Sequence, residues 1–322
     1  MVYDTIIGQE RSIAILKRAW TGGKLAHAYL FDGIEGCGKR KTALALVQSV
    51  FCSDDKGEGC GRCPSCNKVA TLQHPDLHLI EPDGAFIKID QVRELQREMA
   101  FRPFEAPRKA CIIDNADRLN PAAGNALLKT LEEPPGNALI ILITANPGGV
   151  LPTIISRCQR LQFQAIPQPA LEDYLIGQGT PPETAGIASA LAGGSLKKAL
   201  EVSSETVLQE RQSLLQRMLS LSLDNIASLF AAAEELAADK EKAQEMLELI
   251  TTLLRDMLFL RQGSGDISNR DLLPLLEQGA ARFTAASLMT LIEQVATTRR
   301  ALFRNVNTRL ALEVMFMRLA EA

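Results

Sequence analysis

Four cysteines near the N-terminus have the spacing of a metal site, Cys52-x7-Cys60-x2-Cys63-x2-Cys66. The two-residue spacings allow neighbouring sulfurs to converge on one ion. Four thiolates complete a tetrahedral zinc shell and leave no open position for a catalytic water. We therefore expect a structural Zn²⁺ ion at these residues.

Other uses of these thiols stay open at this stage. The cysteines could be free or form a redox pair, and His74 and His78 could replace a sulfur as ligands. The chain begins Met-Val-Tyr-Asp, without a charged segment followed by an apolar stretch, which predicts a cytoplasmic protein. In that compartment, clustered cysteines favour metal over disulfides. Gly57, Gly59 and Gly61 would allow the tight turns of such a module.

The segment from Gly33 to Lys39, Gly-Ile-Glu-Gly-Cys-Gly-Lys, has the composition of a phosphate-binding loop. Gly33 and Gly38 would let backbone N–H groups approach phosphates, and Lys39 would reach the β- and γ-phosphates. The next residue should be Ser or Thr, whose hydroxyl holds Mg²⁺. Arg40 stands there instead and offers only hydrogen-bond donors. We expect a P-loop that does not use Mg-ATP productively; a turn that keeps this shape without any nucleotide is the alternative.

A second motif that ATP hydrolysis requires also departs from its usual sequence. The apolar run Cys111-Ile112-Ile113 leads into Asp114, the position that would hold Mg²⁺ through water. The residue after this aspartate is usually a glutamate that activates the attacking water. Asn115 occupies that position and cannot act as a base near neutral pH. Two independent defects in one site indicate a lost ATPase activity.

The elements that must position these residues alternate over the first 165 residues. The expected strands are 27–32, 77–81, 110–114 and 138–144, and the expected helices are 8–20, 40–51, 91–100 with Asp90 as its cap, and 121–133, stopped by Pro134-Pro135. Such alternation predicts a parallel sheet covered by helices.

Strands largely disappear after the segment 166–169, which has the composition of a linker. Residues 170–203 predict two or three short helices and residues 205–322 several long ones, interrupted by a loop at 262–265. An apolar stripe at three- and four-residue steps is typical of a packed helical bundle; it comprises Leu247, Ile250, Leu254, Met257 and Leu258.

Composition limits the classes of function. The 322 residues are 46% apolar, and the longest strongly apolar run, 138–145, is far shorter than a membrane span. The formal net charge is −3 and the sequence pI is about 5.8. A protein that held DNA mainly through phosphates would be more basic. Any DNA contact should therefore be local or shared with partners.

Several motifs together resemble those of the bacterial DNA polymerase III clamp-loader subunits, a family of AAA+ proteins. The segment 125–135, Asn-Ala-Leu-Leu-Lys-Thr-Leu-Glu-Glu-Pro-Pro, looks like the signature helix of that family, and Ser156-Arg157-Cys158 resembles its SRC motif. The four-cysteine insert is similar to the zinc module of the γ/τ and δ′ members, although its first spacing is seven residues rather than eight. The segment 87–93 resembles a strand–helix junction of the same family.

The resemblance implies an architecture and a set of partners. It implies a RecA-like AAA+ domain with a parallel α/β sheet at 1–166, which carries the four-cysteine zinc module at about 52–66, a small helical lid at 167–204 and an all-α collar at 205–322. It further implies a hetero-pentamer with γ/τ and δ subunits that loads the β sliding clamp, and contact with primer-template DNA mainly through the complex. Because Arg40 and Asn115 replace residues that the γ/τ motors keep, the resemblance is to the δ′ branch.

Two basic residues acquire roles only through this resemblance. Arg157 would be an arginine finger that reaches in trans into a neighbouring ATP site, after a sensor region at Thr144-Ala145-Asn146. Lys197 stands where motor subunits place a sensor arginine. The alternatives are that Lys197 is a solvated charge on a helix and that Arg157 is an ordinary surface arginine. An active γ/τ-type motor and an unrelated AAA+-like scaffold remain alternative functions for the chain.

Overall fold

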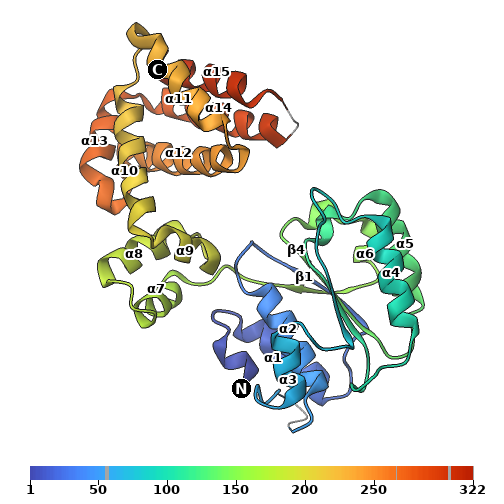
Figure 1. Ribbon diagram of the computed structural model, residues 1–322. Helices are drawn as coiled ribbons and strands as arrows, with labels where there is room; N and C mark the ends of the chain where they lie inside the picture. The colour runs from blue at the N-terminus through green and yellow to red at the C-terminus, as the bar shows by residue number, and fades with distance from the viewer. Residues whose placement is uncertain (55–57, 266, 304–305, 322) are drawn as a thin grey trace. The chain divides into compact units, whose positions relative to one another are not determined.

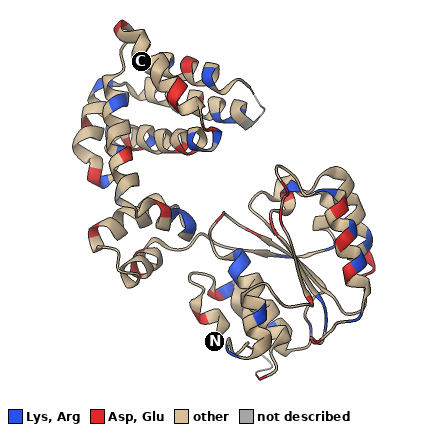
Figure 2. Ribbon diagram, viewed as in Figure 1, with Lys and Arg blue, Asp and Glu red and all other residues tan. Residues whose placement is uncertain are grey.

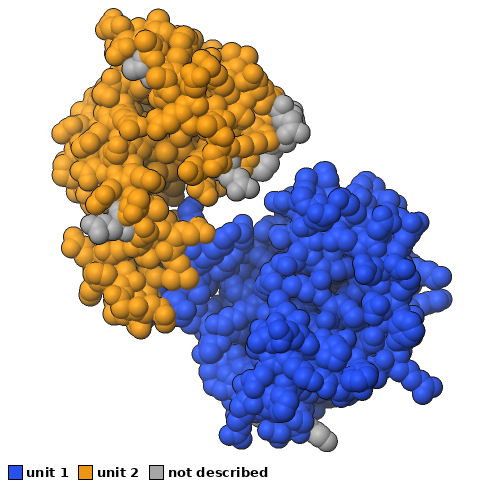
Figure 3. Space-filling view, viewed as in Figure 1, with its two compact units in different colours: residues 1–174, 192–199 blue, residues 175–191, 200–322 orange. Residues whose placement is uncertain are grey.

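The computed structural model describes residues 1–54, 58–265, 267–303 and 306–321 (Figure 1). Gly57, one of the expected turn glycines, lies outside them. The described chain divides into two compact units, Met1–Tyr174 with Ala192–Ala199, and Leu175–Leu191 with Leu200–Ala322 (Figure 3). The finer division into sheet domain, lid and collar stays a prediction.

The first unit contains a five-stranded sheet in which all strand pairs are parallel. Its strands are β1 (Ala28–Asp32), β2 (Leu77–Ile80), β3 (Ala110–Ile113), β4 (Leu139–Thr144) and β5 (Gln159–Gln162), in the spatial order β2-β3-β4-β1-β5. The four predicted strands are confirmed. β5 was not predicted, because its sequence Gln-Arg-Leu-Gln buries only Leu161 and lies at the sheet edge.

Helices cover both faces of this sheet (Figure 1). One face carries α1 (Glu10–Thr21), α2 (Lys39–Phe51) and α3 (Pro64–Ala70), and the other α4 (Ile89–Ala100), α5 (Pro121–Glu132) and α6 (Pro152–Ile155). Strand residues alternate between the faces: Tyr29 and Phe31 pack with the first set, and Leu30 with the second. The short 3-10 helices η1 (Val2–Thr5), η2 (Ala116–Arg118) and η3 (Pro147–Gly149) complete this region.

Two local predictions were wrong. Asp90 is not the cap of α4 but its second residue; Lys88 is the cap, and its backbone N–H donates to the Gln91 side chain at 2.9 Å. The expected linker at 166–169 is partly helical, because α7 (Gln168–Gly177) already begins at Gln168. Proline at the second position of a helix interrupts no backbone hydrogen bond, so Pro169 is compatible with that start.

The remaining described chain is helical. It comprises α8 (Pro182–Leu191), α9 (Leu196–Val202), α10 (Glu205–Ser220), η4 (Leu223–Asn225), α11 (Ile226–Ala237), α12 (Lys240–Arg261), η5 (Arg270–Leu272), α13 (Leu273–Arg282), α14 (Ala285–Phe303) and α15 (Thr308–Glu321). The predicted apolar stripe lies on α12, where Leu247, Ile250, Leu254 and Met257 are fully buried in the core of the second unit. None of the helices in the described ranges is long and apolar enough to cross a membrane.

Candidate functional site

The phosphate-binding loop joins β1 to α2 and closes against the start of α9. Gly36 has a φ of 73°, and a Cβ built there would lie 2.2 Å from the Ser195 hydroxyl, so only glycine fits. The Leu196 N–H donates to the Gly36 carbonyl at 3.0 Å. Lys197 pairs with Glu35 at 2.7 Å, and the hydrogen bond from Lys197 lowers the pKa of Glu35. Lys197 thus contacts the loop itself.

Lys39 is turned onto the loop's own backbone. Its ammonium donates to the carbonyl oxygens of Gly33 and Ile34, both at 2.6 Å. The residue is only 7% exposed, and burial lowers the pKa of its ammonium. Two of its three donors are therefore satisfied within the protein.

Arg40 reaches the acidic residue that follows β3. Its Nη1 lies 3.3 Å from Asp114 Oδ2 and also pairs with Glu81, which follows β2. Because the carboxyl ends of parallel strands share one edge of the sheet, side chains from α2 and from the ends of β2 and β3 meet there. Burial raises the pKa of Asp114, and the Arg40 guanidinium acts in the opposite direction. The Arg40 guanidinium thus contacts the Asp114 carboxylate, which the sequence analysis predicted as a Mg²⁺ ligand.

The backbone conformation at residue 115 favours asparagine. Its φ of 54° is left-handed, a conformation that asparagine tolerates better than most residues, and it precedes η2 as its cap position. Beyond it, Asp117 accepts a hydrogen bond from the Thr144 hydroxyl at 2.6 Å, and the same hydroxyl accepts from the Asn146 N–H at 2.9 Å. The expected sensor region is therefore tied to the segment that follows β3.

Arg157 follows α6 and points to other partners. Its Nε donates to Glu132 Oε1 at 2.8 Å, its Nη2 lies 2.5 Å from the same oxygen, and its Nη1 donates to the Thr153 carbonyl at 2.9 Å. The side chain is 35% exposed. Within the described ranges, its hydrogen bonds and ion pair go to Glu132, Thr153 and Ser156 and not to the P-loop. The structure thus brings Gly33, Gly38, Lys39, Asp114 and Lys197 to one region and leaves Arg157 outside it.

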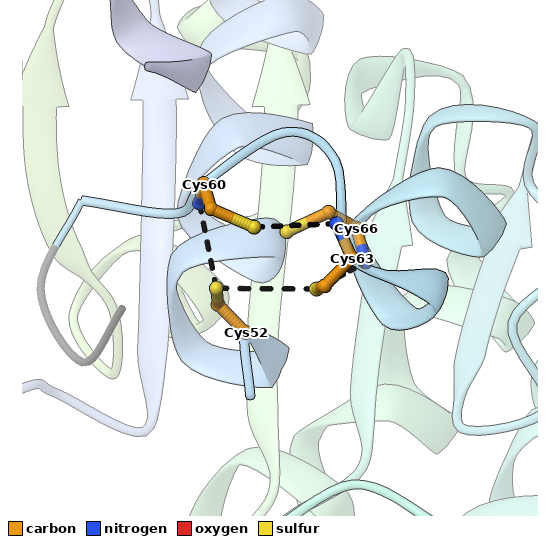
Figure 4. A group of neighbouring side chains, drawn as sticks. All are labelled: Cys52, Cys60, Cys63 and Cys66. Carbon is orange, nitrogen blue, oxygen red and sulfur yellow. Dashed lines mark hydrogen bonds between the residues drawn. The ribbon is translucent and has the colours of Figure 1, made fainter. Parts of the chain in front are cut away.

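The four cysteine sulfurs converge, as predicted (Figure 4). All four lie within 4.8 Å of one another, and Cys52 Sγ is 4.0 Å from Cys63 Sγ. Zn–S bonds of about 2.3 Å in a tetrahedron would place the sulfurs about 3.8 Å apart. Backbone N–H groups point at three of them, from Cys60 to Cys52, from Cys63 to Cys60 and from Cys66 to Cys63, at 3.3–3.4 Å. Such donors stabilise thiolate charge. The donor set and its geometry fit Zn²⁺.

The two histidines considered as substitute ligands are not part of this group. His74 is 2% exposed, packs against Phe51 in a tilted arrangement and accepts the Asp76 N–H on Nδ1 at 3.1 Å. His78 lies on β2, and burial lowers the pKa values of both imidazoles. Gly59, with a φ of 73°, contacts the N-terminal segment, where the Val2 N–H donates to its carbonyl at 3.3 Å.

Two side chains that contact the candidate site residues were missed by sequence reasoning. Gln9 is 2% exposed, and its amide donates to the carbonyls of Cys37 at 3.0 Å and Gln164 at 2.7 Å. These bonds link the P-loop to the segment that follows β5. Glu132 holds Arg157. Gln9 carries no signal in one sequence, whereas Glu132 lies inside the family-like segment 125–135 and could have been considered there.

The fold and this site define a class. A parallel sheet of order β2-β3-β4-β1-β5, a P-loop after β1 and an acidic residue after β3 are the arrangement of a RecA-like AAA+ domain.

Comparisons with known proteins give the family. A model described as "DNA polymerase III, delta subunit" matches residues 8–167, and one described as "DNA polymerase III, delta subunit, C terminal" matches 205–321. The chain is 34% identical to DNA polymerase III subunit delta′ of Bacillus subtilis over 97% of this chain and 96% of that protein. It therefore belongs to the DNA polymerase III delta′ family of clamp-loader subunits.

More distant similarities extend to other subunits. The delta′ subunit of Escherichia coli is 28% identical over 94% of this chain and 92% of its own length. DNA polymerase III subunit gamma/tau of Mycobacterium tuberculosis is 28% identical over 98% of this chain, which spans 60% of that longer protein. Among solved structures, a DNA polymerase III gamma subunit-related protein of Thermotoga maritima aligns over 96% of this chain and 99% of that one, with 19% identity and a TM-score of 0.47.

Proposed function

We propose that this chain is a clamp-loader subunit that does not hydrolyse ATP but completes the ATP site of a neighbouring subunit. The observation that carries the first half is the contact of Arg40 with Asp114 and Glu81. A guanidinium cannot ligate a cation and is not deprotonated in proteins. Its positive charge at Asp114 opposes Mg²⁺ at the position that the metal would need.

The residue that follows Asp114 supports the same proposal. A bound nucleotide would be held by Gly33, Gly38, Lys39 and Lys197, with Lys39 exchanging its two loop carbonyls for phosphate oxygens. Asn115 supplies no general base for water attack. This feature also opposes the alternative of an active γ/τ-type motor.

The second half of the proposal assigns Arg157 as a finger in trans. Its guanidinium is partly exposed and lies outside the chain's own P-loop region, as a residue that serves a neighbour must. A planar guanidinium stabilises the charge that develops on the γ-phosphate in the transition state. The ATP-binding partner would be a γ/τ subunit, and the δ subunit would complete a hetero-pentameric ring.

The remaining assignments concern structure and cargo. Cys52, Cys60, Cys63 and Cys66 would hold one structural Zn²⁺, and the helical region 205–322 would form the collar. The β sliding clamp and primer-template DNA would be engaged mainly through the complex. Figure 2 shows acidic and basic residues interspersed along the helices, and the net charge of −3 fits a subunit that shares its DNA contact.

Reconstitution tests this proposal. Clamp loading on primed DNA should require the chain when γ/τ, δ and clamp are present, and the isolated chain should add no ATPase of its own. A ring that loads clamps at the same rate without this chain would overturn the proposal. Omission of δ provides the matched control for loss of a ring subunit.

A further inference from the structure

The Arg157 guanidinium is held along one of its donor edges. Nε and Nη2 both contact Glu132 Oε1, at 2.8 and 2.5 Å, and Nη1 donates to the Thr153 carbonyl at 2.9 Å. A guanidinium has five N–H donors in a rigid fork. Among the described residues, only the 3.4 Å contact from Nη1 to Ser156 Oγ uses a further donor. Four of the five donors therefore have partners, and the outer edge, formed by Nη1 and Nη2, keeps one Nη2 N–H for a phosphate.

The helix end that carries this carboxylate has a fixed position. α5 ends at Glu132, and Pro134-Pro135 prevents its continuation. His27 Nε2 lies 3.1 Å from the Leu131 carbonyl; because a carbonyl only accepts, this nitrogen carries the proton. Leu127 and Leu131 are fully buried below the same turn. The end of α5 is thus anchored by a hydrogen bond and by core packing.

The arginine side of the pair is anchored to the same helix. Ile154 of α6 is fully buried in the core cluster that contains Leu127 and Leu131. A Cβ at Gly124 would lie 2.7 Å from Leu151 Cδ1, so the absence of a side chain on α5 permits this close approach. Buried packing therefore fixes the distance between the two helix ends from which Glu132 and Arg157 project.

We propose that Glu132 is the positioning residue of Arg157: it orients the guanidinium so that its outer edge faces the phosphate of a neighbouring subunit. The inference rests on the proposed trans function of Arg157. The pair is half-exposed, with 35% of Arg157 and 51% of Glu132 open to solvent, so it contributes little to folding. The pair should instead affect the rate of ATP hydrolysis, because a small misplacement of a charged group raises the free energy of the transition state.

The test compares variants in the fully reconstituted clamp loader. Glu132→Ala should lower kcat for clamp- and DNA-stimulated ATP hydrolysis and the clamp-loading rate, the latter by about three- to tenfold, and leave KM for ATP unchanged. Glu132→Gln keeps an oxygen that can accept from Nε and Nη2 and should restore most of the rate. Glu133→Ala is the matched control, since Glu133 makes no ion pair in the described part of the chain. Thermal unfolding and ring assembly should be unchanged in all three.

A double substitution separates this inference from the proposed function. In an Arg157→Ala background, Glu132→Ala should have no further effect, because Glu132 acts only through the guanidinium. If Arg157→Ala itself loads clamps at the wild-type rate, the finger assignment fails. If Arg157→Ala is slow but Glu132→Ala is at or above the wild-type rate, the finger stands and the positioning role is wrong. An added loss in the double variant would also overturn it.

Discussion

At position 40, an arginine stands where an ATPase of this class needs a hydroxyl oxygen. In the function that we propose, the contact with Asp114 and Glu81 puts an ion pair where an ATPase would hold its metal. Burial raises the pKa of the Asp114 carboxyl, and the nearby guanidinium offsets this effect. The substitution therefore does more than remove one ligand, since it fills the site with the wrong charge.

We expect the isolated chain to show no ATPase above background. Arg40→Thr should not create activity either, since Asn115 would still supply no base. Restoring both positions, with Arg40→Thr and Asn115→Glu, is the informative variant. It should remain below about one hundredth of a motor subunit's rate, because the left-handed backbone at residue 115 disfavours a glutamate there and a misoriented site loses most of its catalysis. Steady-state phosphate release measures each outcome. Robust turnover by the unmodified chain would contradict the assignment.

Arg157→Ala should lower the activity of the assembled ring without changing the folding of the chain that carries it. A trans finger is worth about 10³–10⁵ in rate at a single site. Only one of several ATP sites would lose its finger, so total ATPase should fall by less than about twofold where the sites turn over independently, and clamp loading should fall further, because loading needs all sites to act together. Arg157→Lys should restore little, since a point charge lacks the planar fork. A loading assay with otherwise wild-type partners measures this, with zinc content and ring assembly as controls.

At the scale of elements, runs of buried residues made the sheet predictable. β1, β3 and β4 are continuous apolar segments, and their ends place the P-loop and Asp114 at one edge. β5 escaped prediction because an edge strand with one buried residue leaves no such pattern. The contacts Arg40–Glu81 and Arg157–Glu132 also could not be predicted. They join residues 41 and 25 positions apart, and depend on side-chain orientations that tertiary packing sets.

The cysteine module should contain about one zinc per chain. Cys63→Ser should release it and loosen the module, because the binding free energy of a structural zinc is also folding free energy. The N-terminal segment should loosen with it, since Val2 is bonded to Gly59. Metal analysis of protein purified without chelator tests the stoichiometry, and Cys158→Ser is the control thiol substitution. Protein that carries no zinc would show that the converged sulfurs serve another purpose.

A buried carboxylate organises the segment between α4 and β3. Asp76 is fully buried and accepts the N–H groups of Phe104, Glu105 and Ala106 at 2.7–2.9 Å. Burial alone would raise the pKa of Asp76, but these hydrogen bonds outweigh it and hold the pKa below its usual value.

Asp76→Asn should therefore destabilise the first unit by about 1–3 kcal/mol at neutral pH, because an amide offers one accepting oxygen to three donors. Since the folded-state pKa is lowered, this stabilisation is complete above the unfolded pKa of about 4 and is lost as the pH falls through the folded value. The gap between the unfolding midpoints of variant and wild type should shrink at acid pH. The exposed Asp90→Asn should show no such gap.

For the whole molecule, the two units have separate hydrophobic cores. The first packs helices on both faces of its sheet, and the second surrounds α12 with other helices. A chain truncated after Ser203 should therefore keep the sheet, the cysteine module and the P-loop folded. It should fail to join γ/τ and δ, because the helices of region 205–322 supply the assembly surface that we expect of a collar.

The second unit offers a surface on which to test this assembly without removing the domain. α11 and α15 pack together and carry pairs of exposed apolar residues one helical turn apart, Ile226 with Phe230 and Leu310 with Val314. Leu310 is 57% exposed, so Leu310→Glu should leave folding intact while it places an unpaired charge in a buried interface. We expect the affinity for the partner subunits to fall by tenfold or more, about 1.4 kcal/mol or above. Leu200→Glu, at an exposed apolar position outside region 205–322, is the control. Analytical gel filtration with γ/τ and δ measures complex formation, and full co-elution of both the truncated chain and the Leu310 variant would show that the ring is held by the sheet unit instead.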